Sequence, residues 1–219
     1  MKYIRTHFIA IFIALVYVYF CYLMLGIVLQ YIPYHTDVAF LKIKQDVIGM
    51  LHYRIAFFTH VYTSMLVMFA GFTQFNRSFL NHWPHLHRMA GWLYVIAVLV
   101  LVAPSGFVMG LYANGGLSSQ ISFCLLSVLW FYSTWQALRC AMQKKINAHR
   151  KWMIRSFALT LSAISLRAWK YILVYLLHPA PMDTYRMVAW LSWVFNLIIA
   201  EIIILKYINH EKNPLHTLT

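Results

Sequence analysis

The stretch from His87 to Tyr112 reads HRMAGWLYVIAVLVLVAPSGFVMGLY and contains a single charged side chain, that of Arg88. A helix that crosses the hydrocarbon core of a bilayer needs about 20 consecutive, mostly apolar residues. This stretch meets that requirement, and five others do as well. The six predicted transmembrane helices cover residues 8–31, 55–75, 87–112, 121–141, 152–177 and 187–207. We therefore expect an all-α membrane protein, a bundle of six helices in which residues 1–219 form one transmembrane domain.

The composition of the chain excludes a soluble globular protein. Hydrophobic residues make up 62% and charged residues 11% of the 219 residues, and the mean hydropathy is +0.66. Soluble domains carry about 25% charged residues, and a core of this size cannot enclose so much apolar surface. The first apolar stretch runs to Gln30 without a small-residue cleavage pattern, which indicates a retained helix rather than a signal peptide.

The distribution of basic residues predicts the orientation of the helices. The chain has 18 Lys and Arg against 5 Asp and Glu, a net charge of +13. These basic residues cluster in short connections between apolar stretches, which favours the positive-inside rule over nucleic-acid binding. Twelve of them lie on the same side as the N-terminus and four in the opposite connections. We expect both termini in the cytoplasm, a bacterial inner (plasma) membrane, and the lipid bilayer rather than nucleic acid as partner.

The connection from His35 to Tyr53 is longer than the others. Its apolar residues recur at helical spacing, at Phe40, Ile43, Val47, Ile48 and Leu51. This pattern predicts a short amphipathic helix that lies on the outer membrane surface. A tight turn is predicted at Gly115 and Gly116, because glycine tolerates positive φ.

Three histidines lie on polar stripes of the predicted helices. His60 shares a helix face with Ser64, Val67, Gly71 and Gln74. The corresponding faces in the third and fifth helices carry His87, Gly91 and Tyr94, and His149, Ser156, Thr160 and Arg167. Polar stripes face the interior of a bundle or a cavity rather than lipid. We expect the second, third, fifth and sixth helices to form the functional core, and the first and fourth to contribute little.

His87 and His149 are predicted at the same depth, near the cytoplasmic interface. Both lie near helix N-termini, where the dipole disfavours the imidazolium form, and neutral imidazole is the form that binds metal. Gly91, one turn after His87, leaves room for a flat ring. We predict a haem b whose iron is ligated by His87 and His149, with electron transfer to a quinone or another redox partner. His60 is a further candidate for cofactor binding, and Arg150, Lys151 and Arg155 are candidates to meet the haem propionates.

Polar residues inside the predicted helices define an alternative site. Glu201 and Arg155 are similarly shallow and could pair, whereas Arg167 lies near the middle of the membrane, level with Asn196. Together with His60, they would line a polar interior that binds or transports a small molecule or lipid. The same residues could instead join helices, in a structural or assembly partner of a membrane complex. The oligomeric state and any enzymatic activity stay open.

Common catalytic and metal-binding motifs are absent from the sequence. It contains no P-loop, no GxSxG and no HExxH pattern. Five acidic residues are too few to favour a metal hydrolase. The cysteines Cys21, Cys124 and Cys140 form no CxxC pair, so neither a disulfide framework nor a zinc ribbon is expected.

Three blocks in order resemble the predicted membrane proteins grouped as domain of unknown function 2306. The blocks are HRMAGWLY at 87–94, HRKWMIRSFALT at 149–160 with Arg167, and WVFNL at 193–197 with Ala200 and Glu201. The resemblance covers roughly residues 50 to 205. It implies a multi-pass membrane protein and assigns no activity.

A weaker resemblance is to cytochrome b561-like proteins, which bind haem between four helices through histidines on alternate helices. His87 and His149 match one such pair, and the spacing of His87 and Gly91 is similar. The other pair would need a histidine between residues 121 and 141 opposite His60, and that stretch contains none.

Overall fold

The computed structural model describes the backbone of residues 2–75 and 77–212, and the side chains of residues 8, 11–75 and 80–206. Within these ranges the chain is helical and contains no strand. The elements are α1 (Lys2–Leu29), the 3-10 helix η1 (Ala39–Ile43), α2 (Leu51–Thr73), α3 (Arg77–His82), α4 (Pro84–Ile96), the π-helical segment η2 (Ala97–Val102), α5 (Ala103–Leu111), α6 (Leu117–Met142), α7 (Ile146–Thr160), α8 (Ser162–Leu177) and α9 (Pro181–Lys212).

The predicted all-α membrane architecture is confirmed. Five helices in the described part of the chain are long and apolar enough to cross a membrane, and the pair α7 and α8 makes a sixth if it counts as one span. That pair is bent by 45°, so the continuous helix predicted for residues 152–177 is wrong. The helix breaks at Leu161, between Thr160 and Ser162.

The chain divides into two compact units, Met1–Arg54 and Ile55–Thr219. In the first unit, α1 leads into the connection for which an amphipathic helix is predicted. The helix there is a short 3-10 turn, η1, which buries Leu41. Gln45 explains why it stays short, because its side-chain amide donates to the carbonyls of Thr36 (2.8 Å) and Leu41 (2.9 Å) and folds the chain back.

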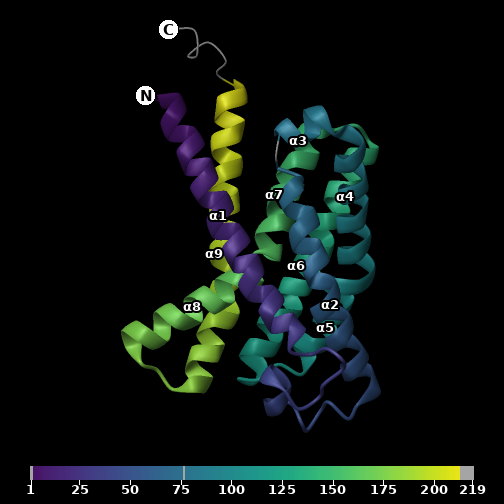
Figure 1. The fold of residues 1–219 in the computed structure, drawn as a ribbon, viewed down its shortest axis with the longest axis vertical. Coiled ribbons are helices and arrows are strands. Elements are labelled where there is room, and N and C mark those ends of the chain that lie inside the picture. Colours follow the sequence, from purple (N-terminus) through teal and green to yellow (C-terminus); the bar gives the residue numbers. More distant parts are fainter. Residues whose placement is uncertain (1, 76, 213–219) are drawn as a thin grey trace. The chain divides into compact units, whose positions relative to one another are not determined.

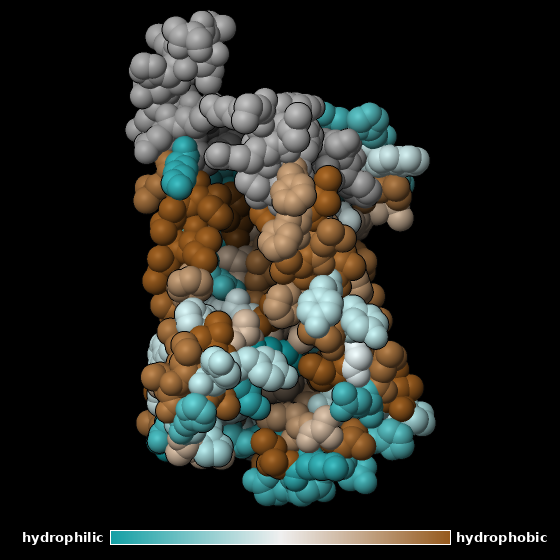
Figure 2. Space-filling model, turned by 60° about the vertical axis from the view of Figure 1, so that its left-hand side comes forward, coloured by the Kyte–Doolittle hydropathy of each residue, from teal (hydrophilic) through white to brown (hydrophobic). Residues whose placement is uncertain are grey.

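The second unit contains the principal core. α6 packs against α5, α7 and α9, and these helices run beside one another in Figure 1. The core is built from apolar side chains of several helices, namely Val67, Tyr94, Val98, Val102, Trp130, Ala137, Met153, Leu159 and Trp193. Side chains that point away from it are also apolar, such as Ile198, Ile202 and Leu205 of α9. Figure 2 shows hydrophobic residues over much of the visible surface, as expected for helices that face lipid.

Local sequence signals explain where several helices begin and end. Pro84 occupies the first turn of α4, where its missing N–H costs no hydrogen bond. Gly115 and Gly116 adopt positive φ values of 85° and 77° in the turn between α5 and α6, as predicted. The predicted span 87–112 is interrupted by η2, and the N–H of Ala103 bonds to the carbonyl of Val98 five residues earlier. Pro104 follows Ala103 directly and has no N–H to donate. Regular α-helical hydrogen bonds therefore resume only in α5.

Candidate functional site

His87 and His149 lie in the first turns of α4 and α7, respectively. The Nδ1 atom of His149 lies 2.8 Å from the carbonyl oxygen of Ala137 in α6. A carbonyl only accepts, so Nδ1 carries the hydrogen and the Nε2 lone pair stays available. The Nδ1 atom of His87 is buried and has no hydrogen-bond partner among the described residues. His87 lies seven residues before Tyr94, and His149 seven residues before Ser156, and the hydroxyl groups of Tyr94 and Ser156 are 2.7 Å apart. Both histidines therefore lie toward the same ends of α4 and α7.

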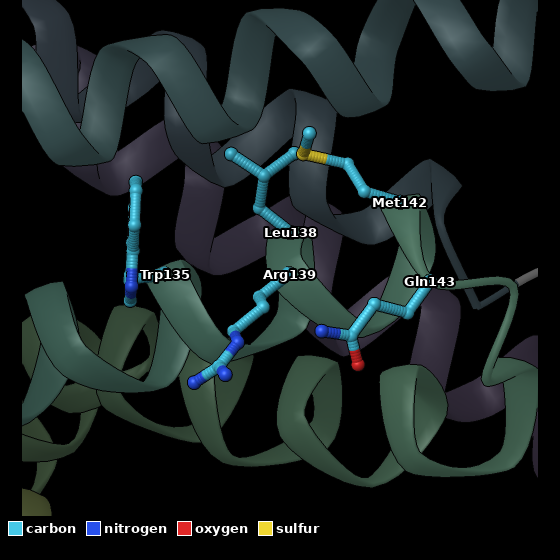
Figure 3. A pocket seen from close by; sticks show the side chains of 5 residues that line it. All are labelled: Trp135, Leu138, Arg139, Met142 and Gln143. Carbon is cyan, nitrogen blue, oxygen red and sulfur yellow. The ribbon is translucent and has the colours of Figure 1, made fainter.

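Gly91 does leave space, but the side chain of Gln74, which directly follows α2, occupies it. A Cβ atom added at Gly91 would lie 3.1 Å from Oε1 of Gln74. The Gln74 amide donates over long distances, 3.3 Å to the carbonyl of His87 and 3.4 Å to that of Ala70. Two shallow hollows lie elsewhere, one on α6 (Figure 3) and one on α1.

A cluster of four hydroxyl groups lies two helical turns deeper than the histidines. Tyr94 Oη lies 2.7 Å from Ser156 Oγ and 2.8 Å from Thr160 Oγ1. Ser156 Oγ is also 2.7 Å from Thr134 Oγ1, whose hydroxyl donates to the carbonyl of Trp130. All four side chains are buried. The cluster ties α4, α6 and α7 together, and its hydroxyl groups satisfy one another away from water.

His60 lies at a different place in the second unit, against the π-helical segment. Its Nδ1 atom is 2.9 Å from the carbonyl oxygen of Val102, which also accepts a hydrogen bond from Ser105 Oγ at 3.1 Å. Gly106 permits this approach, because a Cβ there would lie 3.0 Å from the imidazole.

Arg155 and Glu201 form a two-pronged ion pair between α7 and α9, as the sequence analysis anticipated. Arg155 Nε lies 2.6 Å from Glu201 Oε1, and Nη2 lies 2.9 Å from Oε2. The guanidinium also stacks 4.6 Å above the Trp152 ring. The side chains are 24% and 47% exposed, so water reaches the pair in part.

Asn196 binds both sides of the break between α7 and α8. Its amide nitrogen donates to the carbonyl of Ala158 at 3.0 Å, and its amide oxygen accepts from Ser165 Oγ at 2.8 Å. Arg167 instead donates to the carbonyl of Ala163 at 2.7 Å, within its own helix. Asn196 and the Arg155–Glu201 pair therefore have separate partners.

The expectation that the fourth predicted helix contributes little to the polar interior is wrong. This helix, α6, buries five hydroxyl side chains, those of Ser119, Ser122, Ser127, Ser133 and Thr134. Ser122 donates to the carbonyl of Ala189 at 2.8 Å and accepts from the indole of Trp193 at 2.9 Å. Serine and threonine residues that recur at helical spacing are the sequence signal that could have revealed this polar face of α6. They are less conspicuous in a sequence than histidine or charged residues.

The described residues contain no group of three or more His, Cys, Asp or Glu side chains that could hold a metal ion alone. A family model for a predicted membrane protein, DUF2306, matches residues 57–204. That range includes His60, His87, His149 and Glu201. Comparison with curated proteins and with solved structures gave no match.

Proposed function

The chain belongs to this family of predicted membrane proteins, and we propose that it is a multi-pass electron-transfer protein that binds one haem b between α4 and α7. The observation that carries the proposal is the pair of histidines. One nitrogen of His149 is held by a carbonyl and the other is available, and His87 has a buried nitrogen with no partner among the described residues. Metal-ligating histidines commonly have such a carbonyl partner on the opposite ring nitrogen.

The donor atoms suit a haem iron, and the side chain of Gln74 lies where part of the ring would lie. Gln74 fills the room beside Gly91, and its amide nitrogen lies 3.2 Å from Thr73 Oγ1 and 3.3 and 3.4 Å from the carbonyl oxygens of His87 and Ala70. The whole Gln74 side chain would have to adopt another rotamer before a ring could lie beside Gly91. Lys151 and Arg150 follow His149 on α7, where they would meet the propionates.

A bound haem would supply an iron that accepts and releases one electron. The chain itself would hold the imidazoles in place. The carbonyl of Ala137 would fix the tautomer and orientation of His149, and the hydroxyl cluster around Tyr94 would keep the spacing of α4 and α7. A quinone in the bilayer or a membrane-bound redox protein is the electron partner that this location favours.

Absorption spectra of the purified protein test this proposal. We expect a Soret band after loading with haem b, and a low-spin spectrum that is lost in His87→Ala and in His149→Ala. His85→Ala is the matched control, because His85 is exposed and lies two residues before His87 in α4. The control should keep the wild-type spectrum. If the wild-type protein shows no Soret band even after haem addition, the proposal is wrong.

The alternative, a binding or transport site formed by His60, Arg167, Asn196 and Glu201, has less support. His60 lies against the carbonyl of Val102, Asn196 bonds to Ala158 and Ser165, and Glu201 is paired with Arg155. Arg167 donates to the carbonyl of Ala163. The contacts of His60, Asn196 and Glu201 each join two helices, as structural polar residues in membrane proteins do.

We also propose that both termini face the cytoplasm of a bacterial cell. Arg139, Lys145 and Arg150 lie at or beside the connection between α6 and α7, whereas the connection between α8 and α9 is followed by an ion pair of Arg186 and Asp183. Positive charge is retained on the cytoplasmic side.

Labelling with a membrane-impermeant maleimide checks this orientation in intact cells. With the native cysteines replaced by serine, Met182→Cys should react from outside and Lys145→Cys only after the cells are opened. Both positions are exposed. The reverse pattern would invert the proposed topology.

A further inference from the structure

The last turns of α6 carry a shallow groove of about 250 Å³ that belongs to neither the histidine pair nor the hydroxyl cluster. Two rows of side chains border it, Trp135, Arg139 and Gln143 in one and Leu138 and Met142 in the other. In Figure 3 the head groups of Arg139 and Gln143 extend to one side of the helix, and Leu138 and Met142 lie together on the other. The groove itself is therefore apolar, and one cation and one amide lie beside it.

The surroundings of the groove are basic. Lys144 and Lys145 follow in the connection to α7, and Arg150 and Lys151 lie in the first turns of α7. The sequence contains no Asp or Glu between Asp46 and Asp183. Glu201, on α9, is already bound by Arg155. A ligand with negative charge is therefore favoured at this end of α6.

The position of the groove indicates that the ligand also has an apolar part. It lies on α6, which is one of the helices able to span a membrane, and Trp135 and Met142 are exposed. A span meets acyl chains along its apolar surface and lipid headgroups at its end. The groove offers both contacts within two helical turns.

We propose that this groove is a binding site for an anionic phospholipid. The phosphate accepts hydrogen bonds from Arg139 and Gln143, and one acyl chain lies along Leu138, Met142 and the ring of Trp135. Guanidinium is suited to this role, because its planar set of N–H groups matches two phosphate oxygens. The adjacent lysines favour a lipid with net negative charge over a zwitterionic one.

Native mass spectrometry of the full-length protein in detergent tests the site, with dioleoyl phosphatidylglycerol and dioleoyl phosphatidylcholine as probes. The wild-type protein should bind phosphatidylglycerol more tightly. Arg139→Gln should weaken the first phosphatidylglycerol roughly tenfold, the size expected for loss of a charged hydrogen bond. Arg88→Gln removes the same charge from α4, where Arg88 is exposed, and should leave binding unchanged. Met142→Trp should weaken both lipids by filling the groove while Arg139 stays in place.

Melting temperatures of the variants establish that each one is folded, and a misfolded Met142→Trp is replaced by Met142→Phe. Equal weakening by Arg139→Gln and Arg88→Gln would mean that the basic end attracts lipid without a site, and the proposal would be overturned. The absence of a preference for phosphatidylglycerol, or wild-type binding in the groove-filled variant, would overturn it as well.

Discussion

Gly71→Ala should lower the melting temperature of the protein by roughly 4–8 °C, because overpacking of this kind costs about 2 kcal/mol. A Cβ atom at Gly71 would lie 2.7 Å from two ring atoms of Phe157 and 2.9 Å from Cε2 of Tyr94. The Tyr94 ring cannot easily move, because it is buried and its hydroxyl bonds to Ser156 and Thr160. One methyl group would therefore disturb the place where α2, α4 and α7 meet. Thermal unfolding in detergent, followed by size-exclusion chromatography, measures the effect.

Gly26→Ala is the matched control for this substitution. Gly26 also lies inside a helix, but nothing lies within 4 Å of the position that its Cβ would take. Alanine there should leave stability unchanged or raise it by up to about 1 kcal/mol, the difference in helix propensity. The double variant Gly71→Ala with Phe157→Leu should recover part of the loss. A melting temperature for Gly71→Ala equal to that of the wild type would contradict the tight packing described here.

The ion pair between Arg155 and Glu201 should show the largest coupling energy of any charged pair in the described part of the chain. Two short hydrogen bonds and the stacking on Trp152 hold the guanidinium in one geometry. Both side chains are partly exposed, so solvent screening keeps the expected coupling at about 1–2 kcal/mol, between the values for surface and buried pairs. A double-mutant cycle of Arg155→Gln and Glu201→Gln measures it.

The pair of Asp183 and Arg186 provides the comparison. Its atoms are 3.1 Å apart and its side chains are 52% and 59% exposed, within one helix. A cycle of Asp183→Asn and Arg186→Gln should give about 0.5 kcal/mol or less. Equal coupling in the two cycles would show that the two-pronged geometry adds nothing.

The sequence predicted the part of the candidate site that depends on helical spacing alone. His87, Gly91 and Tyr94 share a face of α4, and Ser156 and Thr160 share one of α7, as their positions in the sequence indicate. Thr134 was missed because the fourth predicted helix contains no histidine and no charge in its middle, so its polar face is not conspicuous.

The sequence alone determined the parts of this protein that depend on neighbouring residues. The length of each apolar stretch predicts helices that cross a bilayer, Pro84 begins α4, and Gly115 and Gly116 form the turn before α6. These features follow from steric limits on the backbone and from the absence of water in the bilayer.

Only the tertiary structure decided which groups meet. His149 binds a carbonyl 12 positions away, His60 one 42 positions away, and Arg155 a carboxylate 46 positions away. The break between α7 and α8 lies where Asn196, from another helix, binds the carbonyl of Ala158. Periodicity shows which face of a helix turns inward, but the partner on that face depends on how the helices pack, because each buried polar group bonds to the donor or acceptor that packing brings within reach.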